Sequence, residues 1–74
     1  MIGRMSVRYK IEYLAHAAVV HLKTPYAATL DAVAGEARSG AATAKALFGA
    51  DGFQIRDMNE DGKVVMTEGP QKLG

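Results

Sequence analysis

The sequence contains no cysteine and no tryptophan among its 74 residues, and only two prolines. Without cysteine, this chain cannot build disulfides, thiolate zinc sites, iron–sulfur clusters or cysteine nucleophiles. A chain of this size buries only about 60% of the surface that its unfolded form exposes, which predicts one small domain over residues 1–74. A core of that size leaves little room for a deep substrate cleft and favours added stabilisation by self-association.

An excess of one charge and a long apolar run are also missing. Nine Lys and Arg against eight Asp and Glu give a net charge of +1, so the charge balance does not favour nucleic acid or anionic lipid. The longest uncharged apolar window, residues 13–22, is about half the length that spans a bilayer. No apolar stretch of signal-peptide length follows the N-terminus. We therefore expect a cytoplasmic protein that does not cross a membrane.

The N-terminal third alternates between apolar and polar residues. Over residues 6–13 the apolar positions fall on one side, as in a half-buried strand: Val7, Tyr9, Ile11 and Tyr13. Residues 17–23 are predicted to return as a second strand after a turn near Ala15-His16, with Ala18, Val20 and Leu22 facing the core and Val19, His21 and Lys23 facing outward. A single helix over 8–23 is the alternative, but the density of β-branched and aromatic residues favours the hairpin.

A long helix is predicted to follow. Thr24-Pro25 is a favourable start, because threonine caps free N–H groups and proline suits the first helical position. Steps of three and four residues then define an apolar face through about Phe48: Tyr26, Leu30, Val33, Ala34, Ala37, Ala41, Ala44, Leu47 and Phe48. Two helices joined at Gly40 are the alternative. Gly49 is expected to end the helix.

The C-terminal part reads as a second hairpin. Strands around residues 53–58 and 63–67 flank the turn Asn59-Glu60-Asp61-Gly62, in which Gly62 takes the left-handed conformation. Gly69-Pro70 stops the last strand, and residues 1–5 and 69–74 are expected to be mobile ends. The order ββαββ predicts a two-layer α+β domain, an antiparallel sheet with one long helix on one face.

Residues 57–68 match the calcium-loop pattern D-x-[DN]-x-[DN]-G-x5-E. The ligands would be oxygens of Asp57, Asn59, Asp61, Lys63 (through its carbonyl group) and Glu68. An EF-hand needs a helix on each side of the loop, however, and Gly69-Pro70 blocks a helix directly after Glu68. The hairpin is therefore favoured, and a divalent-cation site is kept as an alternative.

Few other residues are candidates for catalysis, metal binding or nucleic-acid binding. His16 and His21 would point to different faces, as a turn histidine and a solvent-facing strand histidine. No cofactor is implied, and no serine has the glycine elbow or neighbouring histidine of a nucleophilic enzyme. A basic strip on the open side of the sheet is a further alternative, as a weak nucleic-acid site: Arg8, Lys10, Lys23 and Arg56. We therefore expect a protein that is not an enzyme.

One apolar strip points to a partner. If Phe53, Ile55 and Val65 share the buried side of the second hairpin, the other side exposes Met58, Val64 and Met66. The strip predicts a homodimer or a docked protein partner on the open sheet face or an edge strand. A different strand register, which would place these residues inside, is the alternative.

Three segments resemble small uncharacterised bacterial ββαββ proteins. They are residues 8–13 (RYKIEY), residues 49–57 (GADGFQIRD) after an alanine-rich helix, and residues 61–65 (DGKVV). The resemblance implies the fold and the hairpin, and no catalytic residue, because those proteins have no assigned activity. The leading hypothesis is thus a small interaction or accessory module.

Overall fold

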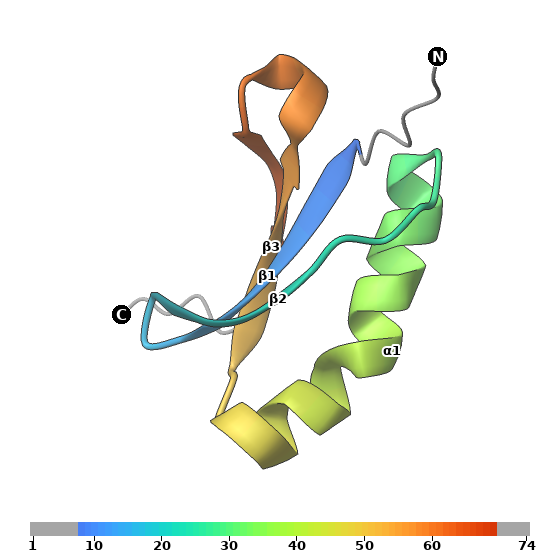
Figure 1. Ribbon diagram of the computed structural model, residues 1–74. Coiled ribbons are helices and arrows are strands. Elements are labelled where there is room, and N and C mark those ends of the chain that lie inside the picture. The colour runs from blue at the N-terminus through green and yellow to red at the C-terminus, as the bar shows by residue number, and fades with distance from the viewer. Residues whose placement is uncertain (1–7, 70–74) are drawn as a thin grey trace.

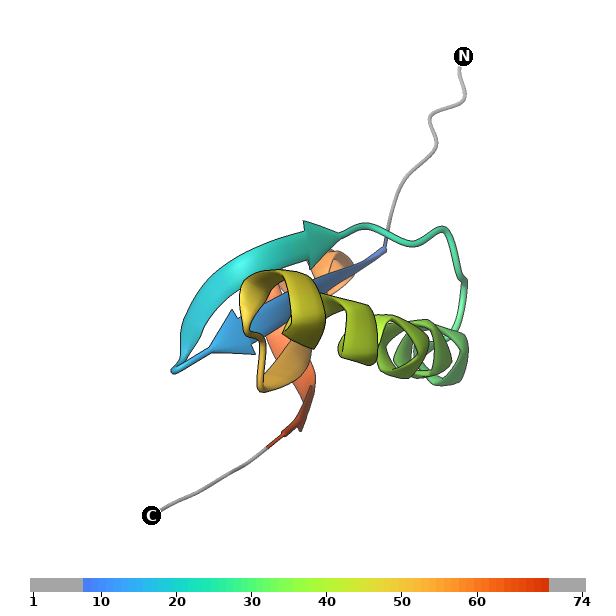
Figure 2. The same ribbon diagram turned by 90° about the horizontal axis from the view of Figure 1, so that it is seen from below.

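The computed structural model describes residues 8–69, which form two layers. The elements are β1 (Tyr9–Ala15), β2 (Ala18–Lys23), α1 (Leu30–Phe48), β3 (Gly52–Asp57), the short 3-10 helix η1 (Met58–Glu60) and β4 (Lys63–Glu68). The strands form one antiparallel sheet in the order β2-β1-β3-β4, and α1 lies on one side of it (Figures 1 and 2). The predicted α+β ββαββ fold is confirmed. The expectations for Ser6, Val7 and the mobile ends lie, except for Gly69, outside the described residues.

The core lies between the two central strands and the middle of α1. Tyr9, Ile11 and Tyr13 are buried on one side of β1, as their alternation predicts. Ile55 of β3 lies opposite Ile11. The helix contributes small side chains that pack against these strands: Val33, Ala34, Ala37 and Ala44. Alanines at the contact let α1 approach the sheet closely, because they project little beyond its backbone.

The first hairpin is confirmed, and the single helix over 8–23 is not formed. His16 and Ala17 make the two-residue turn, with φ angles of 52° and 69°. Two consecutive left-handed residues are typical of a type I′ turn, where Asn-Gly is preferred. The His16 N–H donates to Asp51 Oδ2 at 3.3 Å. That contact helps to hold a turn whose residues do not favour it.

Half of the expected facing of β2, that of residues 21–23, is wrong because the strand contains a β-bulge. Tyr13 lies opposite His21 but Leu14 lies opposite Val19, so Val20 is an extra residue. Val20 packs partly against the core. Beyond the bulge the facing is inverted: His21 shares the side of Tyr13, and Leu22 lies on the other side of the sheet and is 50% exposed.

The helix begins later than predicted. Thr29, not Thr24, is the N-cap, and its hydroxyl accepts a hydrogen bond from the Ala32 N–H at 3.2 Å. Residues 24–29 instead carry the chain from the edge of the sheet to the helix layer, with Pro25 buried. Tyr26 therefore lies outside the helix and is 76% exposed. The end is as predicted: Gly49 adopts the left-handed conformation and its N–H bonds to helix carbonyls.

A single helix runs through Gly40, so the alternative of two joined helices is wrong. A Cβ atom at Gly40 would lie 2.6 Å from Tyr13 Oη. That hydroxyl is fixed, because it donates a hydrogen bond to the Ala37 carbonyl at 2.8 Å and its ring is almost fully buried. Gly40 is thus the residue that lets Tyr13 reach the helix backbone. Past this point α1 changes direction and extends beyond the sheet (Figure 1).

The second hairpin forms, but its loop starts one residue earlier than predicted. Residues 58–60 make a 3-10 turn, and Asp61 and Gly62 follow with φ angles of 57° and 78°. The left-handed glycine is confirmed. Strand β4 also contains a bulge: Ile55 lies opposite Met66 and Arg56 opposite Val64, which leaves Val65 as the extra residue.

The two helix glycines should respond oppositely to substitution by alanine. Gly35→Ala should raise the free energy of unfolding by about 1 kcal/mol, since a Cβ there meets nothing within 4 Å. Gly40→Ala should lower it by about 1–3 kcal/mol, because the new methyl group overlaps the Tyr13 hydroxyl. Urea denaturation of both variants measures these changes. A stabilising Gly40→Ala would contradict the packing described here.

Candidate functional site

The predicted interaction strip is only partly exposed. Met58 on η1 is 44% exposed, and Val64 is 37% exposed on the side of the sheet away from α1. Met66 lies opposite Ile55 and packs against the core, so its expected exposure is wrong. The bulge at Val65 explains the difference. One extra residue places Met66 on the opposite side of the sheet from Val64, whereas a regular strand would place both on the same side.

The sheet side away from α1, here called the open face, is not covered by any element of residues 8–69. The register places a polar group in its centre, made up of Lys10, Glu12, Gln54 and Arg56. Apolar side chains lie at its margins: Leu14, Val19 and Leu22 on the β1–β2 side, and Val64 on β4. A polar centre with apolar margins is therefore the chemical character of this surface.

Glu12 holds the centre of the open face together. Its Oε1 accepts hydrogen bonds from Gln54 Nε2 at 2.6 Å and Arg56 Nε at 2.9 Å, and Lys10 Nζ lies 3.6 Å from Oε2. Burial alone would raise the pKa of Glu12, but the hydrogen bonds from Gln54 and Arg56 and the nearby positive charges lower it. Glu12 is thus ionised at neutral pH and only 6% exposed, although it faces the open side.

His21 lies on the helix side of the sheet, not in solvent as predicted. Its ring stacks on Phe48 with centroids 4.7 Å apart and lies 6.0 Å from the Tyr13 ring. These rings border a groove of about 230 Å³ between β2 and α1, which Lys23, Thr43 and Leu47 also line. Sequence reasoning missed this arrangement because it depends on the bulge at Val20.

A second cleft lies on the other side of Tyr13, between the C-terminal half of α1 and the start of β3. Its volume is about 490 Å³. Small or aromatic residues form most of its walls, among them Ala41, Ala50 and Phe53, with Lys45, Asp51 and Glu68 among the charged ones. The alanines of α1 leave this space because their side chains do not fill the angle between helix and sheet. The cleft is apolar, and the carboxylate of Glu68 is paired with Arg38 at 2.8 Å.

The calcium-loop residues do not surround a common point. In the strand register, Asp57 lies opposite Lys63 at the start of β4, whereas Glu68 lies opposite Phe53 at the end of β4. The two ends of β4 are about 17 Å apart. Arg8 binds the Asp57 carboxylate at 3.1 Å. Asn59 and Asp61 lie in or beside the exposed turn. Within residues 8–69 no three His, Cys, Asp or Glu side chains are arranged to hold a metal ion.

Both end carboxylates of that pattern act as ion-pair partners. The hydrogen bond from Arg8 is the main cause that lowers the pKa of Asp57, against the opposing effect of burial. The hydrogen bond from Arg38 lowers the pKa of Glu68 in the same way. Asp57 also accepts from the Asn59 N–H at 2.9 Å and so caps η1. Its side chain is therefore committed to the hairpin.

The predicted basic strip is not brought together. Lys10 and Arg56 lie on the open face, but Glu12 lies between them and interacts with both. Arg8 is paired with Asp57, and Lys23 lies on the helix side beside Gly40. The cations thus occupy both sides of the sheet, and three of the four contact a carboxylate, two of them the same one.

Comparison of this chain with protein-family models, curated proteins and solved structures found no match. In the part of the chain that the structure describes, no helix combines the length and the apolar character needed to cross a membrane.

Replacement of Glu12 tests the polar centre. Because the pKa of Glu12 is lowered in the folded protein, its carboxylate stabilises the fold above the ordinary glutamate pKa of 4.5, and this contribution is lost as the pH falls through the folded-state pKa. Glu12→Gln should lower the free energy of unfolding by about 1–2 kcal/mol near neutral pH. The difference from the wild type should narrow in acid.

Urea denaturation at several pH values measures this difference. Glu60→Gln, at an exposed position of the turn, is the matched control and should change little at any pH. A Glu12→Gln variant as stable as the wild type at neutral pH would show that the network does not stabilise the sheet.

Proposed function

We propose that this domain is a non-enzymatic interaction module that binds a second protein chain through the open face of its sheet. The observation that carries the proposal is the distribution of groups on that face. Val19, Leu22 and Val64 are between 37% and 50% exposed at the margins, while in the centre one carboxylate, Glu12, contacts both cations. A partner that covers this surface therefore meets one net positive charge, which one carboxylate of its own would balance.

The energetics favour association. Covering apolar surface contributes roughly 25 cal/mol per Å², and a domain below about 70–80 residues gains little stability from its own core. Charged groups that already satisfy each other cost less to bury than solvated ones, because their desolvation is largely complete in the free protein. Glu12, only 6% exposed before any partner binds, is the example here.

The perturbed carboxylates support a role without catalysis. The pKa values of Glu12, Asp57 and Glu68 are all lowered, and each side chain is held by an arginine. A general acid or base is effective when its pKa lies near the working pH, which for a carboxyl group means a raised value. These groups shift in the opposite direction, so their arrangement fits structural ion pairs.

The other candidate functions receive less support. A calcium site would need Asp57 and Glu68 at one point, and the hairpin separates them. A nucleic-acid site would need free cations on one face, and Arg8, Lys10 and Arg56 are paired with carboxylates. Binding of a protein partner to the open face requires no such rearrangement of side chains.

Photo-crosslinking inside cells tests the proposal. A photoreactive phenylalanine derivative at Leu22 or Val64 should give a discrete crosslinked product, because both positions lie on the open face. The same derivative at Ser39, which is exposed on α1, is the matched control and should give none. If Leu22 and Val64 give no product beyond that of Ser39, the open face is not an interaction surface.

A further inference from the structure

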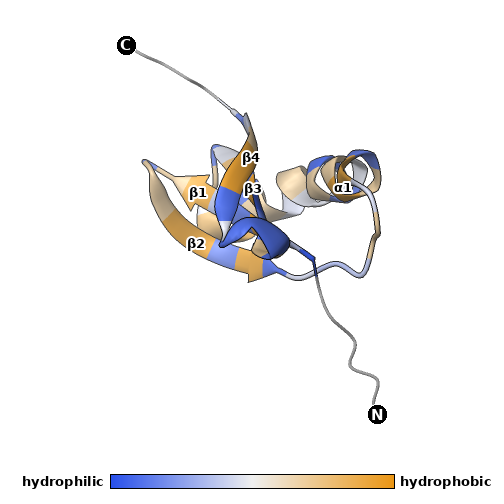
Figure 3. Cartoon of the chain, turned by 90° about the horizontal axis from the view of Figure 1, so that it is seen from above, coloured by the Kyte–Doolittle hydropathy of each residue, from blue (hydrophilic) through white to orange (hydrophobic). Residues whose placement is uncertain are grey.

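The two edges of the sheet differ in character. Strand β4 starts with Lys63 and ends with Glu68, which forms an ion pair with Arg38 of the helix. Strand β2 has one charged residue, Lys23, at its end, and five uncharged residues before it. Figure 3 shows β2 as predominantly hydrophobic. Charged residues protect edge strands from pairing, so β2 is the less protected edge.

Exposed apolar side chains gather around β2. Among residues 8–69, seven large hydrophobic side chains are exposed, and five of them lie on or beside this strand: Val19, Leu22, Tyr26, Leu47 and Phe48. Val19 and Leu22 border the open face. Phe48 lies on the helix side, where it stacks on His21, and Leu47 lines the same groove. Both sides of the β2 edge are therefore apolar.

The outer backbone of β2 is available for pairing. The carbonyl group of Leu14 on β1 accepts from the Asp51 N–H and so points away from β2. Backbone groups of successive strand residues point to opposite sides, so those of Tyr13 and Ile11 point towards β2. The hydrogen-bonded pairs are therefore Tyr13 with His21 and Ile11 with Lys23. Val19 lies opposite Leu14 and Leu22 lies opposite Glu12, so these two residues of β2 direct their backbone groups outward. No other strand of residues 8–69 pairs with this edge.

We propose that a second copy of this chain docks on the β2 edge, antiparallel to the first, about a two-fold axis between Val20 and His21. The inference goes beyond the proposed function, because pairing of two β2 edges extends the sheet and leaves the open face uncovered. In this register Val19 lies opposite Leu22 of the partner subunit, and the reciprocal pair forms on the other side of the axis. The bulge does not disturb the match, because both copies contain it at the same distance from the axis.

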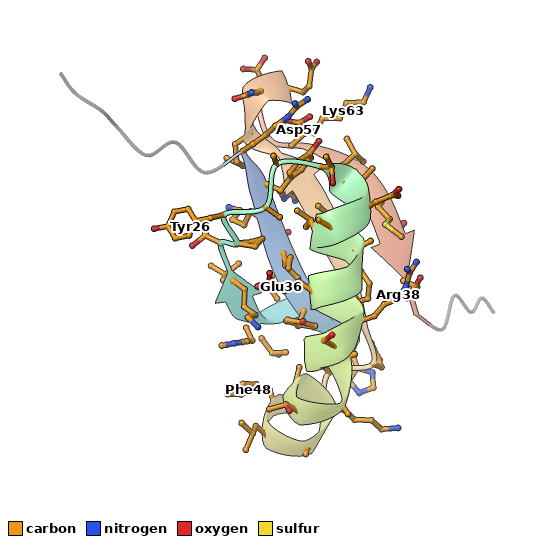
Figure 4. All side chains as sticks on the ribbon, turned by 90° about the vertical axis from the view of Figure 1, so that its right-hand side faces the viewer. Tyr26, Glu36, Arg38, Phe48, Asp57 and Lys63 are labelled. Atoms are coloured by element: carbon orange, nitrogen blue, oxygen red, sulfur yellow. The ribbon has the colours of Figure 1, made fainter. Side chains whose placement is uncertain are left out.

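The side chains around the edge are self-complementary under this two-fold axis. Phe48 lies on His21 next to the axis, so the two Phe48 rings come close together. Tyr26 and Phe48 lie on the same side of α1 towards its opposite ends (Figure 4). The axis therefore turns Tyr26 of one copy towards the last turn of α1, with Leu47, in the other. Lys23 lies opposite Ala18 of the partner subunit, so no like charges face each other.

The available area is close to what a dimer needs. The exposed parts of the five apolar side chains amount to on the order of 500 Å² per copy, and a standard interface buries ~800 Å² per partner. The backbone edge of β2 and the stems of Lys23 and His21 contribute further area. A second copy can thus account for the exposure of this edge.

Charge substitutions on matched strand positions test the interface. The wild-type protein should sediment with twice the mass of one chain at high micromolar concentration. Val19→Lys and Leu22→Lys should weaken the dimer about 10-fold or more, because each places two charges against apolar partners. Ser39→Lys, at an exposed position of α1, is the control and should leave the dimer intact. Val64→Lys, on the open face of the other edge strand, should dissociate only a dimer that forms through the open face.

Crosslinking gives a readout that does not depend on a loss of stability. The natural chain has no cysteine, so Val19→Cys/Leu22→Cys introduces the only thiols. Residues directly opposite in an antiparallel pair are about 4.5–5.5 Å apart between Cα atoms, which suits a disulfide, whereas residues three apart in one strand are about 10 Å apart. The double variant should form a covalent dimer, and Val64→Cys/Thr67→Cys should not.

The outcomes separate this inference from the proposed function. A monomeric wild type without covalent dimers overturns the inference, whereas the proposed function is decided separately by photo-crosslinking at Leu22 and Val64. A dimer that Val64→Lys dissociates and Val19→Lys does not also overturns the β2 interface, but it leaves an interaction through the sheet in place.

Discussion

The hydrogen bond from the Tyr13 hydroxyl to the Ala37 carbonyl fixes the two layers of this domain against each other. Tyr13 lies on a central strand, and its ring contacts Phe53 on the neighbouring strand and His21 on the edge strand. A buried hydroxyl needs a partner, and the helix supplies one only where its side chains are small. Gly40 provides that space. One side chain thus connects the helix with three strands.

The same constraint determines what the surface exposes. A helix that approaches through Ala37, Gly40 and Ala44 lies close to the central strands and has little side-chain bulk to reach the edges. The groove beside β2 and the cleft beside β3 are the spaces that remain on either side of Tyr13. Apolar groups around β2 therefore stay exposed, while Arg38 of the helix forms an ion pair with Glu68 on the other edge strand. The packing of the core and the exposure of the β2 edge thus have one physical origin.

Periodicity and turn chemistry predicted the fold, and local irregularities limited the prediction of the site. The alternation through Tyr13 and the glycine at residue 62 identified a strand and a turn, because those signals are local. A bulge has no comparable signal in one sequence, so the facing of His21 and Met66 was wrong. Thr24-Pro25 has the composition of a helix start, but the chain first has to travel from the sheet edge to the helix layer. The burial of Glu12 depends on Gln54 and Arg56, which only the strand register brings near.

A double-mutant cycle between Tyr13 and Gly40 tests this account most directly. Free energies of unfolding would be measured for the wild type, Tyr13→Phe, Gly40→Ala and the double variant. If the hydroxyl is what Gly40 accommodates, Gly40→Ala should destabilise the wild type yet be neutral, or stabilising by up to about 1 kcal/mol, in the Tyr13→Phe background. The same loss in both backgrounds would contradict the account, because the helix would then need this glycine for a reason unrelated to Tyr13.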